Sequence, residues 1–244
     1  MINETGQTGG NERDASVFSI FVNILTSPAE AFSALDKHPM KWMPLLLVVG
    51  LNAVIIFWYF TILDFDWFVD DTLQNANIPE NQLDDARENF AQMSPSTLRL
   101  FGILGSSVAL VVIYAIQAGY LSLVSALGGH SQKFGHWFSL VVWSGIVVIF
   151  SQVGMIVTLL LDTNGQLGQY DLDPLTLRNL GLRPQNQSLE QMMGSVNIPM
   201  LWSIFLMIQG YKQWLDASTI KAALVVTVPY LLIFGGWGFF ALNS

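Results

Sequence analysis

Five apolar stretches without a charged side chain constrain this chain more than any other feature. They run from about residue 42 to 63, 100 to 127, 137 to 161, 198 to 211 and 222 to 242. The hydrocarbon core of a bilayer, about 30 Å thick, is crossed by a helix of roughly 20 apolar residues. The stretch from 198 to 211 is shorter, so it would either span where the membrane thins or re-enter the same face. We expect it to span, and the sequence therefore predicts an all-α membrane protein, a bundle of five transmembrane helices.

Composition excludes an ordinary water-soluble domain. Hydrophobic residues make up 52% of the 244 residues and charged residues 11%, with a mean hydropathy of +0.47. This leaves too little charge to cover a soluble surface. The net charge of −8 argues against binding of nucleic acid. Because the chain has no cysteine, neither a disulfide nor a thiol-based metal or redox site is possible.

The distribution of lysine and arginine predicts the orientation, since cytoplasmic loops retain positive charge. If the N-terminus is cytoplasmic, six basic residues lie on the inner side: Arg13, Lys37, Lys41, Lys133, Lys212 and Lys221. Four lie on the outer side: Arg87, Arg99, Arg178 and Arg183. The difference between six and four basic residues is small. The inner lysines lie next to predicted helix ends, however, and this strengthens the case for a cytoplasmic N-terminus. We therefore expect a cytoplasmic N-terminus and an external C-terminus.

The first 37 residues precede the five-span membrane domain, which we place at residues 38–244. Residues 1–16 are polar and are expected to form a flexible tail. Residues 17–37 are expected to form amphipathic interfacial helices, because apolar side chains recur at helical spacing. Ser27, Pro28 and Glu30 form a capping-box signal for the second of these helices. Two placements remain open: on the cytoplasmic leaflet, or against the cytoplasmic ends of the bundle.

Two external loops of about 35 residues each carry helix signals of their own. Pro79 begins an apolar pattern in the first loop, and helices are expected at residues 173–181 and from Ser188 in the second. Both loops are thus predicted to form small helical caps. A calcium site in the first loop would need the glycine and terminal glutamate of a calcium-binding loop, which are missing. We therefore predict no metal site at the four aspartates that begin this loop: Asp64, Asp66, Asp70 and Asp71.

Four side-chain amides lie near the middle of otherwise uncharged spans: Asn52, Gln117, Gln152 and Gln209. An unpaired amide in hydrocarbon costs several kcal/mol, so each is expected to face inward and find a partner. These amides are the candidate intramembrane polar site, either as a solute path or as hydrogen bonds between helices that contribute about 0.6 kcal/mol each. Helix contacts are favoured, because transport of ions or protons normally uses an ionisable residue and the span interiors contain none.

Small residues recur at four-residue spacing in the second span, where Gly105 precedes Ala109 and Ala115 precedes Gly119. This pattern predicts a face that contacts another helix. No nucleophile elbow, phosphate loop, zinc-protease or dinucleotide motif occurs, and the three histidines are scattered. We therefore predict that the protein is not an enzyme and that it has no catalytic residues, cofactor or metal.

Several short motifs flank the predicted spans in a fixed order. They are Ser27-Pro28-Ala-Glu-Ala-Phe32, Pro44, Gly128-Gly129, Phe134, Phe138-Ser139, the stretch from Trp202 to Gly210, Asp216-Ala-Ser218 and Lys221-Ala222-Ala223. In this order they resemble the bacterial branch of the Yip family (Ypt-interacting proteins), over most of residues 24–244. The Asp-Leu-Tyr-Gly-Pro motif of many eukaryotic relatives is absent.

The resemblance implies five helices and the same orientation as the charge distribution and, for a bacterial member, a place in the cytoplasmic (inner) membrane. It supplies no site residue. The predicted function is an integral membrane scaffold or adaptor without catalytic activity. Its expected partners are the lipid bilayer and other membrane proteins or further copies of the chain. The alternative is a carrier or channel for a small polar or amphiphilic solute through the bundle interior.

Overall fold

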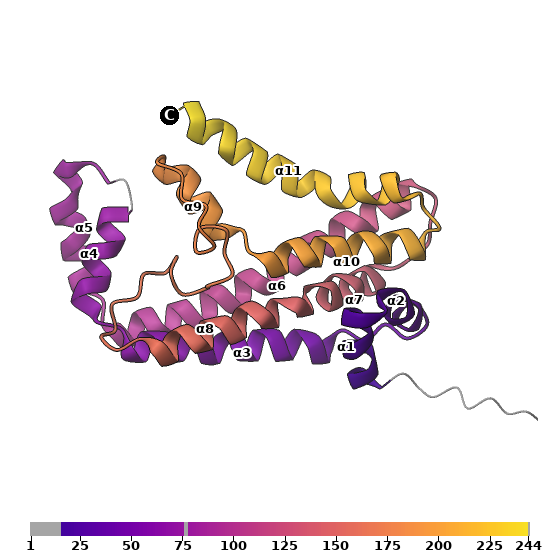
Figure 1. Cartoon of the computed structure of the whole chain (residues 1–244), viewed down its shortest axis with the longest axis horizontal. Helices are drawn as coiled ribbons and strands as arrows, with labels where there is room; N and C mark the ends of the chain where they lie inside the picture. Colours follow the sequence, from indigo (N-terminus) through magenta and orange to yellow (C-terminus); the bar gives the residue numbers. More distant parts are fainter. Residues whose placement is uncertain (1–15, 76–77, 244) are drawn as a thin grey trace, which may run out of the picture.

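Helices make up almost all of the regular structure (Figure 1). The computed structural model describes residues 16–75 and 78–243, so the predicted tail at residues 1–16 lies outside the described residues apart from Ser16. The helical elements in these ranges are α1 (Val17–Thr26), α2 (Pro28–Lys37), α3 (Trp42–Ile62), α4 (Phe65–Asn75), η1 (Glu80–Gln82), α5 (Leu83–Ala91), α6 (Pro95–Leu127), α7 (Phe134–Gly145), η2 (Ile146–Val148), α8 (Ile149–Leu161), α9 (Gln187–Ser195), α10 (Ile198–Trp214) and α11 (Thr219–Asn243).

Four of the predicted spans form helices long and apolar enough to cross a membrane. They are α3, α6, the stretch Phe134–Leu161 and α11, with 21, 33, 28 and 25 residues. The stretch Phe134–Leu161 consists of α7, η2 and α8, so this span contains a 3-10 turn near its centre. α6 begins before its charge-free window because Ser94 caps it: the Ser94 Oγ accepts a hydrogen bond from the backbone N–H of Thr97 at 3.2 Å.

The segment predicted as the fourth of five spans forms the shorter helix α10. Its 17 residues correspond to about 25 Å at the helical rise, less than the hydrocarbon thickness. The helix begins at the folded second loop, where the Asn197 side chain accepts a hydrogen bond from the backbone N–H of Met200 at 2.8 Å. A membrane crossing by α10 therefore stays a prediction, whereas four helices have the length and composition of spans.

The main core lies at the end of the bundle where α2 meets α7 and α10. Trp137 and Trp143 of α7 are fully buried there. The Ser139 hydroxyl and the Trp143 indole N–H both donate to the backbone carbonyl of Met40, at 2.6 and 2.8 Å. Because Met40 lies between α2 and α3, these two bonds fix the entry of the first span against the third.

The helices α1 and α2 pack against this end of the bundle. The Trp214 indole N–H donates to the Phe32 carbonyl at 2.8 Å, and the Gln213 amide donates to the Ala29 carbonyl at the same distance. Phe32 is fully buried, whereas Phe18 on α1 is largely exposed. The sequence left open whether these helices lie on the membrane surface or against the ends of the bundle. The buried face of α2 packs against the end of the bundle.

Two local predictions need correction. Ser27 is the N-cap residue of α2, with Pro28 and Glu30 in the first turn as predicted, but its side chain makes no capping hydrogen bond. Residues 173–181, expected to form a helix, form a series of turns, because backbone bonds tie them to the segment before α10: the Leu177 N–H donates to the Val196 carbonyl at 2.8 Å. The helical parts of the two long loops are α4, α5 and α9, and the α4–α5 hairpin projects from the end of the bundle opposite α2 (Figure 1).

Candidate functional site

Gln152 joins the first and third spans. It lies on α8, one turn after η2, and only 4% of its surface is exposed. Its Nε2 donates to the backbone carbonyl of Val48 on α3 at 2.8 Å. Its Oε1 is buried without a hydrogen-bond partner among the described residues, as are the hydroxyls of Ser144 and Ser151. Gln152 therefore contributes to a helix contact and leaves its acceptor unused.

The other three amides lie at different helix contacts. Asn52 on α3 donates from Nδ2 to the Ser106 hydroxyl on α6 at 2.9 Å. Gln117 on α6 donates from Nε2 to the Tyr230 hydroxyl on α11 at 3.0 Å. Gln209 on α10 is half-buried, and its side-chain amide makes no hydrogen bond to another described residue. None of the four amides bonds to another, and a joint role as one polar site stays a prediction.

Gln117 lines a cavity of about 300 Å³ between α6, α10 and α11, hereafter the lateral cavity. Its other lining residues are mainly aliphatic or aromatic: Ile113, Ile116, Tyr120, Leu121, Met207, Val226, Pro229, Tyr230 and Ile233. Gln152 and Gln209 are not among them. The size is at the lower end of the range for ligand pockets. The lateral cavity can thus hold an apolar group beside one polar pair, Gln117 and Tyr230.

A proline inside α11 is part of the wall of the lateral cavity. Pro229 has no N–H to donate to the carbonyl of Val225, four residues earlier. The Tyr120 hydroxyl of α6 donates to that carbonyl instead, at 2.9 Å. A proline is tolerated in a transmembrane helix where a neighbour satisfies the freed carbonyl, as happens here.

The aspartates that follow α3 have separate partners. Hydrogen bonds from the Gln166 side chain and from the Trp67 backbone, both at 3.2 Å, hold the pKa of Asp64 below its usual value. Asp70 forms an exposed ion pair with Arg87 at 2.8 Å. Within residues 16–75 and 78–243, no three histidine, aspartate or glutamate side chains are grouped as metal ligands.

Asp71 on α4 faces a second carboxylate from the second loop. Partial burial, and then the charge of Asp171, raise the pKa of Asp71. Asp171 itself pairs with Arg178, which also donates to Glu190 on α9 at 2.9 Å. The ion pairs of Arg178 thus join the turns of the second loop to α9, and Asp71 of α4 lies beside them without an ion pair among the described residues.

The two tyrosines at the lateral cavity were not predicted from the sequence. Tyr120 and Tyr230 each place a hydroxyl in a span, and such a hydroxyl needs a partner there as much as an amide does. A further signal was Pro229, since a proline within a span implies a donor on a facing helix. Only the fold, however, shows that Tyr120 is the donor.

Comparison with known families covers nearly the whole chain, since residues 22–240 match the Yip1 domain family. The chain belongs to the Yip1 domain family. It is therefore a multi-pass membrane protein, as its long apolar helices also indicate. All four amides and every residue lining the lateral cavity lie within the Yip1 domain. No curated protein and no solved structure matches the chain. The predicted resemblance is confirmed for the family, and membership of its bacterial branch stays a prediction.

Proposed function

We propose that this Yip1-domain protein is an integral membrane scaffold or adaptor without catalytic activity. Proteins of the Yip1 family are non-catalytic membrane trafficking factors. The role proposed for this chain is to bind, within the bilayer, a transmembrane helix of another membrane protein or of a second copy. The main support for this proposal is the exposed outer face of α6.

The outer face of α6 is uncovered and contains small residues. Only 6% of the most apolar window of α6 is buried inside the protein. A Cβ placed at Gly105 would meet nothing within 4 Å, and Ala109, one turn further, is exposed. Small residues at this spacing let two helix backbones approach closely in a membrane, where packing drives association. The face at Gly105 and Ala109 therefore fits a helix from outside this chain.

Two leucine substitutions at adjacent residues test the adaptor role. Ala109→Leu fills the small-residue face, whereas Val108→Leu enlarges a side chain on the neighbouring face that is already 58% exposed. After crosslinking in cells and extraction in mild detergent, we expect a discrete crosslinked partner for the unchanged protein and for Val108→Leu. Ala109→Leu should lose that partner while the protein stays monodisperse. Retention of the partner, or the lack of any partner in all three samples, would contradict the proposal.

The lateral cavity favours a second candidate function, a carrier for a small amphiphilic solute. Its support is limited to one amide, because Gln117 lines the lateral cavity and Gln152 and Gln209 do not. For a carrier, Gln117→Leu should abolish solute flux into vesicles. Asn52→Leu, at the contact between α3 and α6, should leave the flux unchanged. Flux that survives Gln117→Leu would exclude this candidate.

We further propose that the protein lies in the bacterial cytoplasmic membrane with the α1–α2 end of the bundle in the cytoplasm. Lysines near helix ends support this orientation under the positive-inside rule: Lys37, Lys41, Lys133, Lys212 and Lys221. Single cysteines test it, since the chain has none of its own. An impermeant maleimide should label Asn243→Cys but not Lys37→Cys in intact cells, and the opposite labelling would reverse the orientation.

A further inference from the structure

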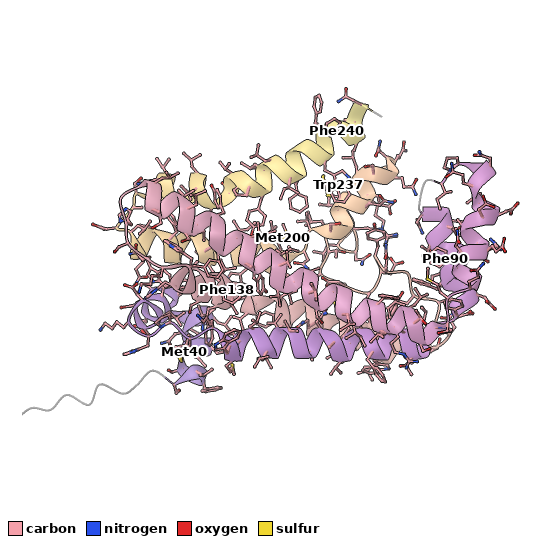
Figure 2. The ribbon with its side chains drawn as sticks, turned by 180° about the vertical axis from the view of Figure 1, so that it is seen from behind. Met40, Phe90, Phe138, Met200, Trp237 and Phe240 are labelled. Atoms are coloured by element: carbon pink, nitrogen blue, oxygen red, sulfur yellow. The ribbon has the colours of Figure 1, made fainter. Side chains whose placement is uncertain are left out.

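α11 lies close to α6 at its start and diverges from it toward the C-terminus (Figure 1). In its first half, the hydrogen bonds from Gln117 and Tyr120 described above tie it to α6. Near its end, the Asn186 side chain donates to the Ala241 carbonyl at 2.7 Å, and the Trp237 indole donates to the Ser188 hydroxyl at 3.0 Å. Figure 2 shows Trp237 beside α9. α11, which forms one wall of the lateral cavity, is therefore held by hydrogen bonds in its first half and near its end.

The lateral cavity has a buried floor and an exposed rim. Leu121, Met207 and Val226 form the floor, and none of them is more than 3% exposed. Ile116 on α6 and Ile233 on α11 lie at the rim, 65% and 63% exposed. Since α6 and α11 are both candidate spans, the rim faces the hydrocarbon of the bilayer. Water is a poor occupant of a space with so few polar partners.

The size of the lateral cavity separates an acyl chain from a helix as its occupant. A 10 Å length of helix with a diameter of about 10 Å fills roughly 800 Å³. The lateral cavity, of about 300 Å³, cannot enclose such a length of helix. A single acyl chain is narrower, so part of it fits inside while the rest lies in the surrounding hydrocarbon.

α11 carries one positive charge, Lys221, between the lateral cavity and the α1–α2 end of the bundle. Lys221 is in the first turn of α11, five residues before Val226, which is about 7.5 Å at the helical rise. Its side chain is exposed and makes no ion pair within the described part of the chain. We propose that the lateral cavity binds one acyl chain of an anionic phospholipid from the leaflet at the α1–α2 end, and that Lys221 pairs with its phosphate.

Photolabelling in vesicles of defined composition tests this site. The protein is reconstituted in phosphatidylcholine with a small fraction of phosphatidylglycerol that carries a diazirine within one acyl chain, and labelled peptides are mapped by mass spectrometry. We expect an excess of label on residues 113–121 and 226–233 over the lipid-facing residues of α3. Ile233→Trp should remove this excess, whereas Leu232→Trp, next to it on α11 but outside the lining, should not.

The charge of the headgroup is tested in the same vesicles. Lys221→Gln should bring labelling by the phosphatidylglycerol probe down to that of a phosphatidylcholine probe with the same chain, whereas Lys133→Gln should not. Uniform labelling of α3, α6 and α11 would mean ordinary surrounding lipid only and would overturn the proposal. Crosslinked dimers through residues 113–121 would overturn it in favour of a second copy. Since Ala109→Leu should leave the labelling unchanged, the lipid site and the adaptor role fail or succeed separately.

Discussion

The third span and α11 are both apolar helices of membrane length, yet they are held in opposite ways. In the stretch Phe134–Leu161, 56% of the most apolar window is buried inside the protein, against 6% in α11. The third span packs against α3, α6 and α10, whereas α11 packs mainly on α10 and α9. The third span therefore stabilises the fold through its contacts, whereas α11 leaves most of its surface exposed to the membrane.

Close packing around α7 explains the difference. The ring of Trp137 lies 5.5 Å from that of Tyr211 and 5.6 Å from that of Trp214. Gly210 lets α10 approach, since a Cβ there would lie 2.7 Å from Leu140 Cδ1. Helices in lipid associate through such contacts more than through exclusion from water. The part around α7 therefore supplies stability, and the outer faces of α6 and α11 are left exposed.

The largest effect is expected from removing a core aromatic side chain. Trp137→Ala should destabilise the protein by about 3–5 kcal/mol, because a large buried side chain leaves a cavity. Phe240→Ala on α11, where the side chain is 72% exposed, should have little effect. Apparent melting temperatures in detergent measure both. Equal losses would break the proposed division between the two regions.

Gly210 on α10 and Gly235 on α11 allow the same substitution to be compared in the packed and the exposed region. Gly210→Ala should cost about 1–3 kcal/mol, since the added methyl group overpacks the contact between α10 and α7. Gly235→Ala on α11 should be neutral or stabilising, because a Cβ there meets nothing within 4 Å and alanine favours the helix by about 0.5–1 kcal/mol. The same melting experiment checks both, and a loss at Gly235 would show that α11 is packed more tightly than described.

The bond between α6 and α11 predicts a smaller, conditional effect. Tyr120→Phe leaves the Val225 carbonyl without a donor and should cost about 0.5–1.5 kcal/mol. Pro229→Ala restores an N–H to that carbonyl, so Tyr120→Phe should cost nothing in the Pro229→Ala background. A double-mutant cycle of melting temperatures measures the coupling. Additive losses would mean that the tyrosine does not replace the missing helix bond.

The smallest effect concerns the contact between Asp71 of α4 and Asp171 of the second loop. Because the pKa of Asp71 is raised above the usual value of about 3.9, the folded chain binds this proton more tightly than the unfolded chain does. Stability therefore falls as pH rises through the raised pKa. Asp71→Asn should raise the melting temperature slightly near neutral pH and not near pH 4. Asp70→Asn, which loses the pair with Arg87, should give no such gain.

The helical class, the four long spans and the loop helices α5 and α9 could be predicted because hydropathy and capping signals are local. α9, for example, begins at Gln187, next to the predicted start at Ser188. The loop helix α4 was not predicted. The turns at residues 173–181 could not be predicted, since backbone bonds to the segment before α10 override the local helix signal. Whether α10 spans could not be settled, because its 17 residues are fewer than the roughly 20 that a membrane crossing needs.

The candidate site was predicted only in part. Gln117 was found because an amide within a span needs a partner. Its partner Tyr230 and the wall at Pro229 depend on how α11 crosses α6, and no spacing in the sequence encodes that crossing. For Gln152, the sequence indicated an inward position, whereas its bond to the Val48 carbonyl follows from the packing of α8 on α3.

The adaptor role is tested by a photoreactive benzophenone side chain placed at Ala109 on α6 and, in a second variant, at Leu46 on α3. Both positions are exposed on apolar spans, and Leu46 is 67% exposed. In illuminated cells, we expect a discrete protein adduct from Ala109 and none from Leu46. No protein adduct from Ala109, or the same adducts from both positions, would contradict the adaptor role.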